Sequence, residues 1–201
     1  MTVPTATIPT QAGTGPSLAD TAPKVLSLLA GYVGHRTVSI GLLRLATTYP
    51  NCTIVGVDGD QHSIDRARDR LAGAGLADRV ELICSALEDM ELDAPARVVV
   101  NNISMHECRD IDRVTENVRA ALEPGGTFVI SDFPFPDTDE ALRSVPGRIM
   151  TGIQFFEAQI DDQLLPRAAY DDLLTRHGFT DLGSVQLTPM HALTYGRRPR
   201  D

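Results

Sequence analysis

The residues Thr53–Asp60, with the sequence TIVGVDGD, constrain the fold of this chain most strongly. A short, mostly apolar and β-branched run ends in an acid and a glycine, and Ser63–Gly75 then has the pattern of a helix. A continuous apolar run of this length is typical of a strand covered on both faces, as in a parallel sheet. Ligands of open α/β sheets gather at the carboxyl ends of such strands, where an acid can bind a ribose hydroxyl. Asp58 therefore has two interpretations, a ligand-binding acid or a residue that starts a turn or caps the helix.

Composition indicates one globular domain without a nucleic acid partner. The chain has 201 residues, of which 42% are hydrophobic and 22% charged, enough for a real core. Its net charge of −9 disfavours nucleic acid and anionic membrane surfaces as main partners, because both attract basic proteins. Lys24 is the only lysine, so the sequence contains no Walker A phosphate loop.

The cysteines and histidines do not indicate a metal site. Cys52, Cys84 and Cys108 have no paired spacing, and with no visible signal peptide we expect reduced thiols in a cytoplasmic protein. The 5 histidines are scattered, and none forms a His-Glu-x-x-His pattern. No apolar run reaches membrane-spanning length, so we expect no membrane partner.

The first fifty residues are expected to contain little sheet. Residues 1–16 are rich in Thr, Pro and Gly and are expected to form a mobile tail before a single domain over 17–201. The next segment is expected to form a helix that is capped by Ser17 or Asp20, carries Val25, Leu26, Leu28 and Leu29, and ends at Gly31 and Gly34. A short strand is then expected at His35–Ser39, followed by a helix at Ile40–Thr48.

Strands and helices alternate in the rest of the chain. Strands are expected at Cys52–Val57, Val80–Cys84, Arg97–Ile103, Thr127–Asp132, Asp181–Leu187 and His191–Arg197. Helices are expected at Asp110–Leu122, Asp137–Ile160 and Arg167–His177, the second interrupted at Pro146-Gly147. The alternation predicts an α/β fold with a mostly parallel sheet and an antiparallel C-terminal hairpin strand.

Four segments from residue 50 onward carry a family resemblance. They are Tyr49–Asp58, Met105–Asp110 (MHECRD), Leu122–Phe133 (LEPGGTFVISDF), and Gly178-Phe179 followed by Pro189–Leu193. In this order they resemble the class I S-adenosylmethionine-dependent methyltransferases, most closely the small-molecule O-methyltransferases of the caffeate and hydroxyneurosporene kind. The resemblance implies a Rossmann-like methyltransferase fold, S-adenosylmethionine as cofactor and a small phenolic or enolic metabolite as substrate.

The resemblance also implies which residues bind the cofactor. Asp58 and Gly59 would lie at the ribose, and Ser85, Ala86 and Leu87 at the adenine. Asn101 and Asn102 end a strand, where they face cofactor or substrate or satisfy the backbone of a turn.

Two departures from the family pattern bear on cofactor binding. The family has a glycine-rich loop after its first strand, whereas Val38 here runs directly into Ser39, as if about eight residues were missing from this sequence or this protein. On this interpretation Gly31 and Gly34 precede the first strand and cannot replace the loop. In addition, Ser85-Ala86 stands where the family has Gly-Asp, the Asp holding the adenine amino group.

His106 occupies the position of the family's catalytic base. A neutral imidazole suits proton removal from a hydroxyl near pH 7, and Glu107 could orient or charge-stabilise it. The alternative is that His106 caps or packs at the start of the next helix. The substrate pocket could be lined by Met105, Met150, Phe155, Phe156 and His191, although the methionines and phenylalanines could equally be core.

Three hypotheses for function follow. The first is an O-methyltransferase with His106 as general base. The second is a methyltransferase-like protein that has lost methyl transfer and catalyses a cyclisation or rearrangement, or only binds a ligand; the incomplete glycine loop and Ala86 motivate it. The third is an interaction partner of a related active enzyme. A homodimer is also compatible with the sequence.

Overall fold

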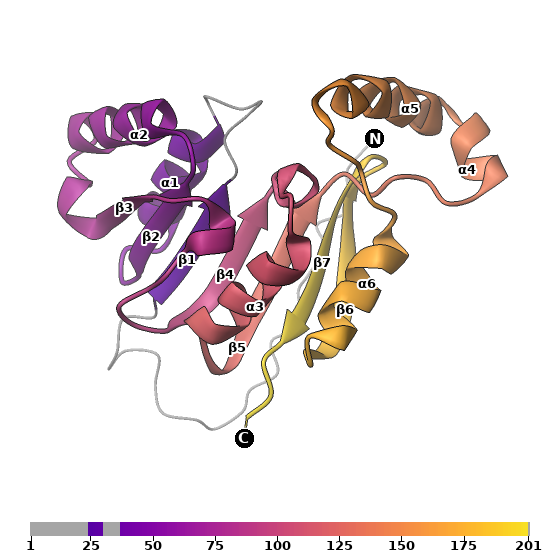
Figure 1. The fold of residues 1–201 in the computed structure, drawn as a ribbon. Coiled ribbons are helices and arrows are strands. Elements are labelled where there is room, and N and C mark those ends of the chain that lie inside the picture. The colour runs from indigo at the N-terminus through magenta and orange to yellow at the C-terminus, as the bar shows by residue number, and fades with distance from the viewer. Residues whose placement is uncertain (1–23, 30–36, 201) are drawn as a thin grey trace, which may run out of the picture.

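A computed structural model describes residues 24–29 and 37–200, which form one seven-stranded sheet with helices on both faces (Figure 1). The strand order is β3-β2-β1-β4-β5-β7-β6. The strands are β1 (Lys24–Leu29), β2 (Thr53–Asp58), β3 (Val80–Cys84), β4 (Ala96–Asn102), β5 (Leu122–Asp132), β6 (Thr180–Thr188) and β7 (His191–Arg197). Neighbours among β1–β5 pair in parallel, whereas β7 is antiparallel to both β5 and β6. The predicted mostly parallel sheet with an antiparallel C-terminal strand is therefore confirmed.

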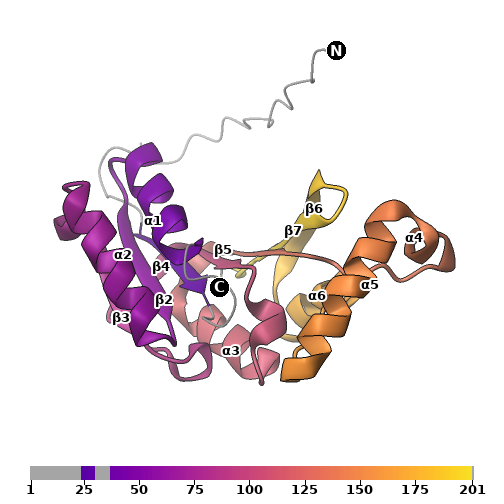
Figure 2. The same ribbon diagram turned by 90° about the horizontal axis from the view of Figure 1, so that it is seen from above.

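The helices connect successive strands. They are α1 (Thr37–Thr48), α2 (Gln61–Gly73), α3 (Ile111–Ala121), α4 (Asp139–Arg143), α5 (Val145–Glu157) and α6 (Arg167–Arg176). Short 3-10 helices are η1 (Ala77–Arg79), η2 (Leu87–Asp89), η3 (Met105–Glu107) and η4 (Ala158–Ile160). Figure 2 shows α1 and α2 at one end of the sheet and the pair α4 and α5 at the other end.

Alternate residues of β2 supply two hydrophobic clusters on opposite faces of the sheet. Ile54 packs with α1 and α2 residues such as Leu42 and Leu71. Val55 belongs to the larger cluster with residues of β4, β5, α3 and α6. The continuous apolar run that identified this strand is thus buried on both faces, as a strand inside a parallel sheet must be.

The N-terminal part of the sequence prediction is wrong. The segment Lys24–Leu29 is strand β1, not a helix, and it lies in the middle of the sheet between β2 and β4. Thr37–Ser39 belongs to α1 and is not part of a strand. The reason is that the apolar run of VLSLL suits a buried central strand as well as one face of a helix, and only pairing with two neighbours decides between them.

With β1 at Lys24–Leu29, the residues of the glycine-rich loop no longer have to be missing from the sequence. Because β1 ends at Leu29 and α1 begins at Thr37, the connection between them is residues 30–36, with the sequence AGYVGHR. Gly31 and Gly34 follow the first strand in the sequence, where the family pattern has its glycines. Residues 30–36 themselves, like the expected tail at 1–16, lie outside the described residues.

The other predicted elements are present, most with small shifts, but β5 begins at Leu122 and not at the predicted Thr127. The predicted interruption at Pro146-Gly147 lies instead at Ser144, which caps α5 by accepting from the Gly147 N–H. Pro146 belongs to the first turn of α5, where proline is tolerated because its missing N–H would have no helical partner.

Candidate active site

The candidate site lies where the parallel strands end. Asp58, Cys84, Asn102 and Asp132 are the last residues of β2, β3, β4 and β5. Because these strands are parallel, their carboxyl ends meet at one edge of the sheet, the usual ligand-binding edge of such folds. After β4 the chain turns immediately into η3, which carries His106.

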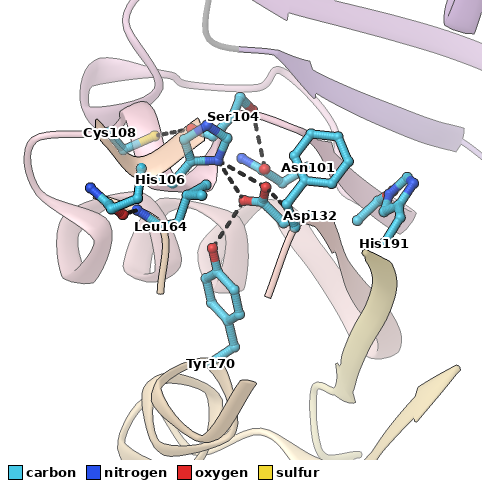
Figure 3. Close-up of polar contacts among 11 residues, drawn as sticks. Asn101, Ser104, His106, Cys108, Asp132, Leu164, Tyr170 and His191 are labelled. Atoms are coloured by element: carbon cyan, nitrogen blue, oxygen red, sulfur yellow. Dashed lines mark hydrogen bonds and ion pairs between the residues drawn. The ribbon is translucent and has the colours of Figure 1, made fainter. Parts of the chain in front are cut away.

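His106 and Asp132 form a buried pair at this edge (Figure 3). The Nδ1 atom of His106 lies 2.8 Å from Oδ1 and 3.0 Å from Oδ2 of Asp132. Only 3% of the His106 side chain and 2% of the Asp132 side chain are exposed. Because a carboxylate only accepts hydrogen bonds, Nδ1 carries the proton of the neutral imidazole, and Nε2 has the free electron pair of a base.

Further hydrogen bonds orient Asp132. The hydroxyl of Tyr170, from α6, donates to Oδ2 over 2.9 Å, and the N–H of Phe133 donates to Oδ1 over 2.8 Å. Burial, together with the nearby charge of Asp132, raises the pKa of Tyr170 well above its usual value, so this hydroxyl remains a donor. The carboxylate is therefore fixed from three directions.

The pKa of His106 is raised above its ordinary value of 6.5. Burial is the largest influence and lowers this pKa, but the hydrogen bond and charge of Asp132 outweigh it, with help from Glu107 and Glu157. The site therefore stabilises the protonated imidazole, which is the form that a general base reaches after taking a proton.

A cavity of about 620 Å³ opens at the same edge of the sheet; Glu107 and Cys108 line it, whereas His106 and Asp132 do not. Its walls come from the residues after β2, after β3, in and after η3, and at the end of η4. The lining residues are Gly59, Asp60, Ala86, Leu87, Glu88, Glu107, Cys108, Arg109, Ile160, Asp161 and Asp162. The volume is within the range of pockets that bind cofactors and drug-sized ligands.

The predicted cofactor residues are distributed around this cavity. Gly59, Ala86 and Leu87 line it, and Ser85 directly precedes Ala86. Asp58 is fully buried at the end of β2, and its Oδ1 accepts from the Asp60 N–H over 2.7 Å. Helix α2 is capped by Asp60, not by Asp58. Asp58 thus shapes the turn before α2, as one of its two interpretations expects, and its binding of a ribose stays a prediction.

Asn101 and Asn102 lie at the end of β4. Asn101 is fully buried, and its Oδ1 accepts from the Ser104 hydroxyl over 3.1 Å. Asn102 lines a second cavity of about 340 Å³ beside α1.

Arg109 ties the segment after α5 to η3. Its guanidinium donates to the carbonyls of Asp161 and Ile160 over 2.6 and 2.9 Å and lies 3.0 Å from the Asp162 carboxylate. Burial raises the pKa of Asp162, against the effect of Arg109. These contacts hold the far wall of the cavity against the wall that carries Glu107.

The predicted substrate residues do not line this cavity. Met105 is fully buried in the larger hydrophobic cluster, and Met150 is also buried. Phe155 and Phe156 are 67% and 69% exposed on α5. His191 bonds through Nε2 to the Ser131 hydroxyl over 2.9 Å. Its ring packs against Phe133 with 5.2 Å between the ring centroids, and burial lowers its pKa against the effect of the Asp132 charge.

Sequence reasoning missed Asp132 and Tyr170 as site residues. A signal for Asp132 was present, because an acid ends the strand segment TFVISD as Asp58 ends TIVGVD. Tyr170 has no such signal, since it lies inside a helix and reaches the site only through tertiary packing.

Of the described residues, none forms a group of three or more His, Cys, Asp and Glu side chains suited to holding a metal ion. Within the same residues, no helix combines the length and the apolar character needed to cross a membrane.

Fold and site together define a class: a Rossmann-like α/β protein with a cofactor-sized cavity and a buried His–Asp pair at the carboxyl ends of its strands. Comparison with known families then narrows the class, because residues 39–126 match the family described as "Methyltransferase domain". The sequence is also similar to carboxy-S-adenosyl-L-methionine synthases, with 29% identity over 96 residues to that of Shewanella sediminis and 33% over 84 residues to that of Shewanella woodyi. These alignments cover 47% and 41% of this chain but only 39% and 34% of the relatives.

Solved structures share the fold over almost the whole chain. An O-methyltransferase family 2 protein from Planctomyces limnophilus, in complex with apigenin, has a TM-score of 0.73 at 16% identity and is matched over 92% of this chain and 52% of its own. The mitomycin 7-O-methyltransferase MmcR has a TM-score of 0.71 at 15% identity, covering 90% of this chain and 50% of its own. A putative methyltransferase from Bacillus halodurans has a TM-score of 0.66 at 14% identity and is matched over 93% of its length.

The expected resemblance to the class I S-adenosylmethionine-dependent methyltransferases is therefore confirmed, together with the Rossmann-like methyltransferase fold. Residues 39–126 match a methyltransferase domain, and the solved methyltransferases share the fold of this chain. The chain spans about half the length of several of these structures and about two fifths or less of the relatives quoted above.

Proposed function

We propose that this chain is an S-adenosylmethionine-dependent O-methyltransferase acting on a small phenolic or enolic metabolite, with His106 as general base. The observation that carries the proposal is the buried contact of the His106 Nδ1 atom with the Asp132 carboxylate, at the edge of the sheet where Glu107 and Cys108 line a cofactor-sized cavity. The contact leaves Nε2 as the basic atom. A biosynthetic role in small-molecule metabolism, in the cytoplasm and without a nucleic acid or membrane partner, accompanies this proposal.

The described residues fit the cofactor in size and polarity. Asp58 and Gly59 would hold the ribose, and Ala86 and Leu87 the adenine, at the cavity wall. When bound, S-adenosylmethionine supplies a methyl group on a cationic sulfur to an oxygen nucleophile. Among the cavity-lining residues, five are acidic and one, Arg109, is basic, so the lining suits a cationic ligand better than an anionic one.

The chain's own residues would activate the acceptor. His106 Nε2 removes the proton of the substrate hydroxyl, and Asp132 stabilises the imidazolium that results. Tyr170 and the Phe133 N–H keep the Asp132 carboxylate in place. This arrangement provides positioning and proton removal, the two tasks that methyl transfer to a hydroxyl requires.

A second candidate is formation of a carboxylated sulfonium, because the similar sequences are carboxy-S-adenosyl-L-methionine synthases. A carboxylate ligand is bound most strongly by a cationic side chain such as arginine. In the described cavity lining the one arginine is already engaged by two carbonyls and Asp162. The acidic lining therefore favours methyl transfer.

The proposal is tested by incubating the protein with S-adenosylmethionine and a panel of phenols, catechols and enols, with mass spectrometry of the products. Transfer of one methyl group is expected, and His106→Gln should lower turnover by roughly 10²–10⁴-fold with little change in cofactor affinity. His177→Gln, at the end of α6, is the matched control. Methyl transfer by His106→Gln at the unmodified rate would contradict the role of His106, and donor-independent turnover would favour the alternative of a protein that has lost methyl transfer.

A further inference from the structure

The backbone takes a strained turn between β4 and His106. Ile103 has a φ angle of +54°, in the left-handed region, where a β-branched side chain is sterically disfavoured and glycine or asparagine is far more common. Among the described residues other than glycine, Ile103, Asp161 and Asp181 have positive φ, and Ile103 is the one with a branched side chain. Strain of this kind persists only where surrounding contacts impose it, and it concentrates at functional sites.

The contacts before the turn continue the sheet. Asn102 pairs with Ser131 in the β4–β5 ladder, and the Ile103 N–H donates to the Ser131 carbonyl over 2.7 Å. The chain is therefore held to β5 up to the strained residue itself.

The contacts after the turn anchor the chain in the interior. The fully buried Ser104 donates through its hydroxyl to Asn101, and its carbonyl accepts from the Glu107 N–H and from the Cys108 thiol, each over 3.2 Å. Met105 then enters the hydrophobic core with no exposed surface. Ile103 thus lies between two segments that are each held in place by hydrogen bonds or by packing in the core.

The result of this turn is the position of the His106 imidazole. Since Asn102 lies opposite Ser131, the next residue of β5 is Asp132, and the chain must reverse after Ile103 to bring His106 back over it. A negative φ at Ile103 would change the direction of the chain after this residue and move the His106 imidazole away from the Asp132 carboxylate. The side chain of Ile103 is only half-buried and is not part of the described hydrophobic clusters, so core packing does not account for an isoleucine here.

We propose that Ile103 is a positioning residue, whose strained backbone fixes the His106 imidazole against Asp132 at a cost in stability. The consequence for catalysis rests on the proposed function, whereas the positioning itself does not.

The variant that tests this proposal is Ile103→Gly, which accepts positive φ without strain but allows many other conformations. Two measurements on the whole chain separate positioning from structure: the thermal midpoint, and an NMR titration of the His106 side-chain nitrogens. The charged groups that face or surround His106 are Asp132 of β5, Glu107 of η3, Glu157 of α5 and Asp162 after η4.

In Ile103→Gly we expect an unchanged or higher thermal midpoint, a His106 pKa that falls toward about 6.5, and loss of the single Nδ1–H tautomer. Turnover of the acceptor that the native chain methylates should fall at least roughly tenfold. Ile103→Val keeps the branched side chain and should retain the raised pKa and the tautomer. Asp181→Gly relieves a positive φ of 51° in β6, far from the site in sequence, and should raise the midpoint without altering the His106 titration.

If His106 in Ile103→Gly keeps the native pKa and tautomer, the proposal is wrong. A fall in thermal midpoint that accompanies loss of turnover would also contradict it, because that result indicates a purely structural role. If no variant and no native sample transfers methyl groups, the proposed function fails. The NMR titration still decides whether Ile103 positions His106.

Discussion

The Nδ1 atom of His106 lies within 3.0 Å of both carboxylate oxygens of Asp132, although 26 residues separate the two in the chain. The contact joins η3 to the end of β5 and is buried on both sides. It assigns separate roles to the two imidazole nitrogens, since the one facing Asp132 is held as a donor and the other remains basic.

Asp132→Asn should change the pH dependence of turnover as well as its size. Asp132 raises the pKa of His106, so its loss should move the acidic limb of kcat/KM to lower pH. The maximal rate should fall about ten- to a hundredfold, corresponding to the ~1.5–3 kcal/mol of a charge-assisted hydrogen bond. A pH profile that keeps its acidic limb in place would show that Asp132 does not act on the base.

The pair should also make stability depend on pH. A folded-state pKa above the unfolded value of about 6.5 stabilises the protein below pH ~6.5, and this contribution is lost as pH rises through the folded pKa. The excess unfolding free energy of the native chain over His106→Gln should therefore be larger at about pH 6 than at about pH 8. Urea unfolding at the two pH values measures it, and an excess that grows with pH would contradict the raised pKa.

Tyr170→Phe should remove one hydrogen bond from Asp132 while keeping the packing of the ring. Because the acceptor is a buried carboxylate, the loss should cost about 1.5–3 kcal/mol of unfolding free energy. Turnover should fall less than in Asp132→Asn, since the Phe133 N–H and His106 still hold the carboxylate. Tyr195→Phe, in β7, is the matched control, and equal effects of the two variants would argue against the role of Tyr170.

Asp58→Asn should weaken cofactor binding without altering the chemistry. The buried carboxylate ends β2 at the cavity, and a lost hydrogen bond to a charged group should weaken cofactor binding about tenfold or more. Turnover at saturating cofactor should remain close to native. Asp78→Asn, in η1, provides the comparison. Unchanged affinity in Asp58→Asn would mean that Asp58 only shapes the turn with Asp60.

Local sequence patterns were sufficient to predict most of the strands and helices of the fold. The strands β3 and β7 were predicted with their observed ends, and β6 with small shifts, because apolar alternation and turn residues mark them directly. Strand β1 was not, since Lys24–Leu29 has an apolar pattern that also suits a helix and its identity depends on pairing with β2 and β4. That single error produced the apparent absence of the glycine-rich loop.

The residues of the candidate site differ in how much local sequence signal they have. His106 and Asp58 follow strand-like runs and could be found from their place in the sequence. Asp132 becomes a partner of His106 only when β4 and β5 pair in register, and Tyr170 only when α6 packs on that face. Such contacts between distant segments leave little trace in a single sequence.

The most direct test of the account is a calorimetric titration of the folded chain with S-adenosylmethionine and S-adenosylhomocysteine. The account expects stoichiometric binding of both at micromolar strength, equivalent to about 8 kcal/mol, and weaker binding to Asp58→Asn. Absence of heat and of binding in a sample shown to be folded would contradict it, because the cavity at the strand ends would then serve a different ligand.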